Sequence, residues 1–204
     1  DEAVALAQKA VAAGGGAAAT GALAHAQEAK GDLAAAEASY RQAIAADPVA
    51  VGPIVGLATV LRKTGRAAEA EPMLKKAIDS SPGAVEAYME MARVKMALGR
   101  SQEALSDANL AAAMSENDPE AQELVIEVRV ARSLQDVGAG QADLAVQELT
   151  QLRDQNPSSA VVRLGLGREV NHKRVARLMR ERGLSGVSRR RRQTGCTRSR
   201  PNDH

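Results

Sequence analysis

Few side chains of this 204-residue sequence have the types and the spacing that catalysis or ligand binding requires. The three histidines are widely separated, and no group of His, Cys, Asp and Glu has the spacing of a metal site. The stretches GAGQAD at Gly138 and LGLGRE at Leu164 follow no strand pattern, so neither matches a phosphate-binding or dinucleotide-binding loop. Cys196 has no base nearby in the sequence and is expected to be an inert thiol. We therefore expect no enzyme activity, no metal and no cofactor.

Basic side chains near the C-terminal end have the chemistry to contact phosphate groups. Residues 163–204 contain 13 Lys and Arg against 3 Asp and Glu, a net charge of +10, whereas residues 1–162 contain 14 against 22, a net charge of −8. The overall charge of +2 therefore hides an acidic body and a basic end. Basic ends of this kind often bind nucleic acid or an anionic membrane, and a solvated disordered tail has the same composition. The candidate phosphate-contacting residues are Lys173, Arg174, Arg177, Arg180, Arg189, Arg190, Arg191 and Arg192.

The composition predicts that helices, rather than strands, position the functional residues of this chain. Alanine accounts for 42 of the 204 residues, and Tyr40 and Tyr88 are the only aromatic side chains. Alanine favours helices, whereas sheets favour β-branched and aromatic residues, so we expect an all-α fold and exclude an all-β one. Few rings are present to stack on bases or to line a small-molecule pocket. Both tyrosines are expected to pack between helices.

A 34-residue repeat is the most specific pattern in the sequence. Gly31, Gly65 and Gly99 recur at this interval, and Pro48 and Pro82 are separated by the same interval. Glycine can end a helix in the left-handed conformation, and the residue before proline disfavours helix, so each period is predicted to contain two helices. Small residues at fixed positions would let these helices approach closely. The alanines in register are Ala24, Ala58 and Ala92; Ala36, Ala70 and Ala104; and Ala43, Ala77 and Ala111.

These residues resemble the tetratricopeptide repeat family, whose unit is a 34-residue helix-turn-helix. The resemblance implies a right-handed superhelical solenoid of antiparallel helix pairs. Because the spacing of the prolines lengthens from Pro82 to Pro119 and again to Pro157, the last repeat is expected to contain a longer first helix or an irregular turn. The expected units are a half-repeat at 2–16, repeats at 17–50, 51–84 and 85–118, a degenerate repeat at 119–157, and a basic appendage at 161–204, partly helical and then disordered.

The resemblance also implies a concave groove, lined by the first helix of each pair, that holds a peptide or a helix of a partner protein. Family members that clamp a C-terminal carboxylate use Lys, Asn and Arg at positions that here hold Gly21, His25, Gly56 and Glu90, so this specificity is not predicted. Arg62, Lys63 and Arg93 form a small basic spot among the implied groove positions. The alternative interpretation is that these three are ordinary solvated helix residues. The implied groove residues are His25, Glu28, Val55, Thr59, Arg62, Lys63, Glu86, Met89, Arg93 and Met96.

The sequence from Glu169 to about Pro201 resembles the helix-turn-helix end of the orfB-type transposases of the IS3 insertion-sequence family. The matching stretch is VNHKRVARLMRERGL, followed by GV and an arginine run. Asn171 suits a helix N-cap and Gly183 a helix end. The resemblance implies contact with DNA phosphates. The acidic triad domain of that family does not follow, so no transposition chemistry is implied. A DNA-binding arm and a piece of a transposase frame fused to a repeat protein both stay open.

The leading expectation is a non-catalytic protein–protein interaction scaffold, and the alternative is DNA binding through the basic appendage. Self-association through the open end of the solenoid is a third alternative. No apolar run approaches the roughly 18 residues that span a bilayer, and no secretory signal pattern is present. A cytoplasmic location is expected, and a periplasmic one stays open because the sequence begins with Asp and can be a fragment.

Overall fold

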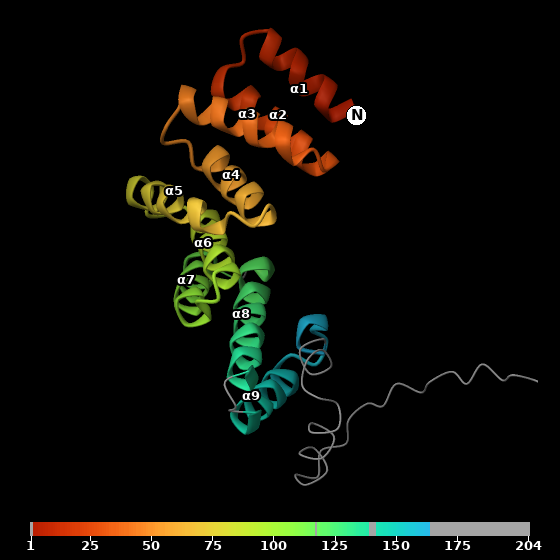
Figure 1. Cartoon of the computed structure of the whole chain (residues 1–204), viewed down its shortest axis with the longest axis vertical. Coiled ribbons are helices and arrows are strands. Elements are labelled where there is room, and N and C mark those ends of the chain that lie inside the picture. Colours follow the sequence, from red (N-terminus) through yellow and green to blue (C-terminus); the bar gives the residue numbers. More distant parts are fainter. Residues whose placement is uncertain (1, 117, 139–141, 164–204) are drawn as a thin grey trace, which may run out of the picture.

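The computed structural model describes residues 2–116, 118–138 and 142–163, which are helical and contain no strand. The helices follow one another in a curved stack that runs from α1 at one end to α9 at the other (Figure 1). The predictions for residues 164–204, a short basic helix and a disordered tail, lie outside the described residues. The helices are α1 (Glu2–Ala12), α2 (Gly16–Lys30), α3 (Leu33–Ala46), α4 (Val51–Lys63), α5 (Ala67–Ser80), α6 (Val85–Ala97), α7 (Ser101–Met114), α8 (Pro119–Gly138) and α9 (Ala142–Gln155).

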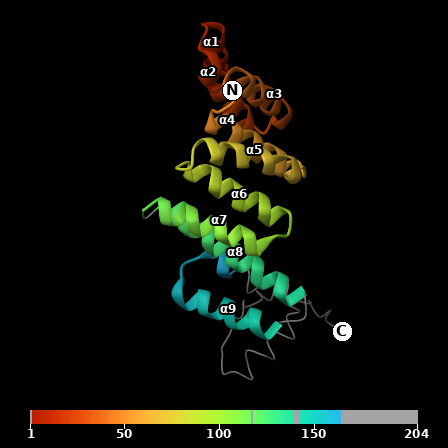
Figure 2. The same cartoon turned by 90° about the vertical axis from the view of Figure 1, so that its left-hand side faces the viewer.

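Each helix packs against the next one in the chain, so that the stack consists of antiparallel pairs (Figure 2). In addition, α2, α4, α6 and α8 contact one another in succession. We call these four helices the inner row, and α3, α5, α7 and α9 the outer row. The all-α solenoid predicted from the 34-residue spacing is confirmed by this arrangement.

The repeated small residues are the contact points of the stack. All nine alanines in the 34-residue register are at most 1% exposed. Gly31, Gly65 and Gly99 have φ values of 88°, 79° and 75°, in the left-handed region that favours glycine. At the end of α2, for example, the N–H groups of Gly31 and Asp32 donate to the carbonyls of Glu28 and Gln27, which closes the last turn. Sequence, helix ends and packing therefore agree in these repeats.

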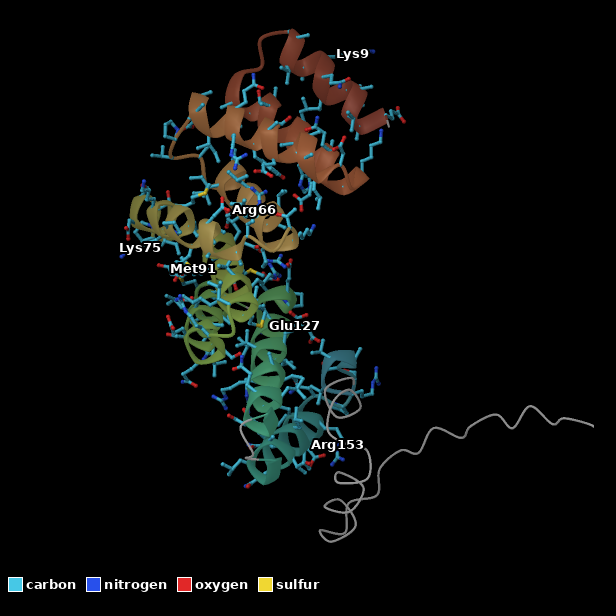
Figure 3. The ribbon with its side chains drawn as sticks, viewed as in Figure 1. Lys9, Arg66, Lys75, Met91, Glu127 and Arg153 are labelled. Atoms are coloured by element: carbon cyan, nitrogen blue, oxygen red, sulfur yellow. The ribbon has the colours of Figure 1, made fainter. Side chains whose placement is uncertain are left out.

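Two ion pairs also follow the repeat. Arg66, labelled in Figure 3 at the junction of α4 and α5, donates to Glu37 on α3. One period later, Arg100 donates to Glu71 on α5, with 2.9 Å from Nη1 to Oε2. Each pair therefore connects one repeat to the next. The hydrogen bonds from Arg66 and Arg100 lower the pKa of the Glu37 and Glu71 carboxyls, respectively.

The last helix pair departs from the others, as the proline spacing predicts. α8 has 20 residues, whereas α4 and α6 each have 13. The carboxylate of Glu148 on α9 accepts hydrogen bonds from three α8 side chains, Arg129 at 3.4 Å, Arg132 at 2.6 Å and Ser133 at 2.9 Å. Burial acts to raise the pKa of Glu148, but these hydrogen bonds outweigh it, so the pKa is lowered. The longer first helix is thus present and is fixed to its partner helix by charge.

Acidification should weaken the stack, because Glu37 and Glu71 have lowered pKa values. A carboxyl with a pKa below its unfolded value contributes stability at neutral pH, and this contribution is lost as the pH falls through the folded pKa. We expect a Glu37→Gln/Glu71→Gln variant to melt a few degrees below the parent at pH 7, and to lose less melting temperature between pH 7 and pH 3. Circular dichroism melts measure both effects. An Asp79→Asn control at an exposed position of α5 should match the parent, and equal acid sensitivity in all three proteins would contradict the prediction.

Candidate functional site

The inner row contains a pocket of about 460 Å³, which lies mainly between α2 and α4. Small and apolar residues form most of its wall, so it offers room for an apolar group with polar atoms near the rim. Five of the ten predicted groove residues line it, namely His25, Glu28, Val55, Thr59 and Glu86. The other lining residues are Ala18, Gly21, Tyr40, Gly52, Pro53 and Gly56.

Tyr40 on α3 is the one lining residue of this pocket that comes from the outer row. Its side chain is 3% exposed and packs against the backbone of Gly56, where an added Cβ would lie 2.2 Å from the ring. The Tyr40 hydroxyl donates to Glu28 at 3.0 Å, and burial, together with this bond, raises the pKa of the phenol. The predicted packing role is confirmed for Tyr40, which also lines the pocket. Tyr88 is partly buried against the core, as predicted.

The three basic residues predicted in the groove, Arg62, Lys63 and Arg93, all form ion pairs with carboxylates. Glu90 is 2% exposed and accepts a hydrogen bond from Arg62 Nε at 2.7 Å. Arg93 lies 3.7 Å from the other Glu90 oxygen and donates to Glu120 at 2.8 Å. Lys63 donates to Glu28 at 2.8 Å. The predicted basic spot is therefore neutralised by carboxylates of the same groove.

A second feature of the inner row is the set of carboxylates on α8. Glu120, Glu123 and Glu127 are spaced three and four residues apart, so they share one side of the helix, and we call them the acidic face. Glu123 accepts a hydrogen bond from Ser159 at 3.0 Å, and Glu120 is paired with Arg93. Glu127, labelled in Figure 3, is half-buried and has no hydrogen bond or ion pair within the described residues.

The charge of Glu127 is disfavoured where it stands. Burial raises the pKa of the Glu127 carboxyl, and the neighbouring Glu123 and Glu120 add to the rise. Arg93 and Arg62 act in the opposite direction, but they do not outweigh burial. The acidic face thus retains a carboxylate that a cation from outside the described residues would stabilise.

The remaining predicted site residues divide into two groups. Met89 is 6% exposed and belongs to the core, and Met96 packs against the same cluster, so these two offer little surface to a ligand. The eight predicted phosphate-contacting residues between Lys173 and Arg192 lie outside the described residues. No group of three or more potential metal ligands occurs in the described part of the chain. In that same part, every helix is too short or too polar to cross a membrane.

Sequence reasoning missed the acidic face, although a signal for it exists. The groove register advances by one repeat period from Val55 to Met89, and a second period leads to Glu123. The same steps lead from Thr59 through Arg93 to Glu127. The groove register therefore continues into the degenerate repeat, where carboxylates take the inward positions.

Known families and structures resemble this chain along most of its length. Two tetratricopeptide repeat models match residues 18–49 and 61–125, and an HTH-like domain model matches residues 159–192. No curated protein sequence matches the chain significantly. A thermophilic tetratricopeptide repeat protein of Thermus thermophilus has a TM-score of 0.55 and 20% identity over 86% of this chain and 88% of that one.

Two further structures share the fold. YrrB, described as a tetratricopeptide repeat protein with an unusual peptide-binding site, has a TM-score of 0.56 and 18% identity over 85% of this chain and 88% of that one. The first tetratricopeptide repeat domain of Spaghetti (RPAP3), bound to the HSP90 peptide SRMEEVD, has a TM-score of 0.51 and 20% identity over 55% of this chain and 89% of that one.

A stack of antiparallel helix pairs with a pocketed inner row defines a helical-repeat solenoid. Tetratricopeptide repeat models match two stretches of it between residues 18 and 125, and its fold is similar to those of tetratricopeptide repeat proteins. The HTH-like match overlaps the segment expected to resemble a helix-turn-helix and begins earlier, at residue 159. Models of two different families therefore match different parts of the chain.

Removing the charge should lower the stability of the fold at Glu90 and raise it at Glu127. Glu90→Gln removes the buried partner of Arg62 and Arg93, so we expect it to destabilise the fold by about 1–3 kcal/mol. The pKa of Glu127 is raised, so its ionised form opposes folding at pH 7, and Glu127→Gln should raise the melting temperature. Thermal melts at pH 7 and about 0.5 M salt, where contacts of Glu127 with other charged segments are screened, measure both changes. A drop for Glu127→Gln as large as that for Glu90→Gln would refute this electrostatic assignment.

Proposed function

We propose that this chain is a protein-interaction scaffold that holds a peptide or a helix of a partner protein on its inner row. The observation that carries the proposal is the pocket between α2 and α4, whose volume of about 460 Å³ suits an apolar side chain and its neighbours. Gly52, one of the three glycines that line it, has open space where a Cβ would stand, and this lets a ligand backbone approach α4 closely. The Spaghetti domain and YrrB support the proposal, because their descriptions report peptide binding by this fold.

The groove chemistry argues against an acidic C-terminal motif as the ligand. The positions where related proteins clamp a carboxylate hold Gly21, His25, Gly56 and Glu90 here, and Arg62 is already paired with Glu90. A carboxylate entering this groove would meet a paired cation and additional carboxylates. The proposed ligand is therefore an apolar segment without a dense acidic end.

Filling the pocket tests this proposal. A displayed peptide library is selected against the full chain, and the affinities of the selected peptides are measured by fluorescence anisotropy. A Cβ added at Gly52 meets nothing within 4 Å, so Gly52→Leu places a side chain in the pocket without a clash. We expect Gly52→Leu to weaken binding by at least about tenfold, which corresponds to about 1.4 kcal/mol.

The matched control is Ala68→Leu, at an exposed position on α5 of the outer row. It adds the same side chain away from the pocket, so binding should not change. The scaffold proposal is overturned if the library yields no binder, or if the selected peptides bind Gly52→Leu as tightly as the parent.

DNA binding is a second proposed function, and the HTH-like match over residues 159–192 favours it. Mobility shifts of duplex DNA with the full chain test this function at increasing salt. Binding should weaken steeply with salt, because phosphate contacts release counterions. Replacing Arg189–Arg192 with alanine should abolish the shift, while the Gly52→Leu pocket variant should retain it. Absence of a shift at low salt would end this proposal.

A further inference from the structure

The inner row offers an incoming ligand more uncompensated negative than positive charge. Arg62, Lys63 and Arg93 are each paired with a carboxylate of the inner row. The two arginines in the middle of α8 are likewise engaged, since Arg129 and Arg132 bind Glu148 of α9. Because these cations are occupied, the carboxylates of the acidic face are only partly neutralised by their own surroundings.

Glu86 and Glu127 are carboxylates of the inner row that stand without a polar partner. Glu127 is half-buried between α6 and α8, and Glu86 is exposed at the start of α6 and lines the pocket. Neither has a hydrogen bond or an ion pair within the described residues. The half-buried carboxylate of Glu127 costs free energy unless a cation approaches it, whereas Glu86 adds a solvent-exposed negative charge. The inner row therefore suits a ligand that carries Lys or Arg side chains.

The described chain ends beside this surface. Ser159 donates to Glu123 of the acidic face at 3.0 Å, and Val162 is fully buried in a cluster with Val130 of α8 and Leu149 of α9. Figure 1 shows these last described residues in blue, next to α8. The basic part of the sequence begins immediately afterwards, with Arg163. The basic part of the chain therefore starts next to the acidic face.

Charge and length both allow this part of the chain to reach the carboxylates. The segment at 164–204 contains 12 Lys and Arg against 3 Asp and Glu. An extended chain covers about 3.3 Å per residue, so a small part of this segment suffices to pass along α8. Because the segment is tethered, its effective concentration at the groove is on the order of millimolar. Even weak individual ion pairs would then give appreciable occupancy.

We propose that the acidic face of α8, which includes the unpaired Glu127, binds the basic segment of residues 168–192 of the same chain. Guanidinium groups of the segment pair with Glu123 and Glu127, which the inner row leaves incompletely neutralised. DNA then competes with the acidic face for the same arginines, and only a protein partner that extends as far as α8 must displace the segment. The interaction does not depend on the pocket function, because it uses α8 rather than the α2–α4 surface.

A single lysine makes this contact testable. Lys173 is the only lysine after Arg163, so zero-length carbodiimide cross-linking of the full chain reports on one amine of the segment. Mass spectrometry should identify amide cross-links from Lys173 to Glu120, Glu123 or Glu127. These cross-links should fall several-fold at about 0.5 M salt, where screening lengths drop to a few ångströms. An Arg174→Ala/Arg177→Ala/Arg180→Ala variant, which keeps Lys173, should show the same several-fold loss.

The control variant Arg198→Ala/Arg200→Ala removes charge outside the proposed segment and should leave the cross-links unchanged. Cross-links from Lys173 that reach only Glu169 and Glu181 would overturn the proposal. Mixing isotopically labelled with unlabelled protein detects a contact between two copies, and mixed-label cross-links to α8 would overturn the same-chain assignment. Failure of the library to yield any peptide binder would leave the Lys173 cross-links unaffected, so the two proposals fail independently.

Discussion

The whole structure depends on the close approach of helices through alanine. Nine alanines repeat at 34-residue intervals and are at most 1% exposed, so the facing helices meet with almost no side chain between them. Each alanine buries little apolar surface, and stability must come from many such contacts along the stack. Leu61, Leu74 and Leu124 are also fully buried in the stack, and the Tyr40 ring packs where the facing helix carries Gly56. Helix spacing, and with it the row of helices that faces inward, is therefore set by small residues.

Polar groups supply the directional contacts that these methyl groups cannot. The pairs Arg66–Glu37 and Arg100–Glu71 recur with the same 34-residue period, and each connects one repeat to the next. One period further on, the equivalent positions hold Leu105 and Leu134, both partly buried and apolar. Here α8 contacts the preceding repeat through neutral acceptors instead, since Gln135 donates to the Gly99 carbonyl at 2.9 Å and Arg132 donates to the Gln102 side chain at 3.4 Å. The degenerate repeat is thus held to its neighbours by different chemistry.

The sequence predicts the fold well because the fold rests on spacing. Helix ends at Gly31, Gly65 and Gly99 and the buried alanines follow from positions that can be counted along the chain. The site is harder to predict, since its charge depends on which residues meet across helices. Arg62 and Glu90 are 28 residues apart and pair only after α4 and α6 have packed. Met89 keeps the groove register but turns out to be core, because burial depends on how far α8 covers α6.

Internal pairing decides what charge a ligand encounters in the groove. Glu90 is only 2% exposed, so its charge must be compensated by neighbouring cations. Arg62 and Arg93 provide that compensation, and Glu28 similarly occupies Lys63. A groove whose sequence contains a basic spot therefore presents carboxylates to a ligand. One buried acidic residue, by pairing with the nearby arginines, therefore changes the charge that the inner row presents.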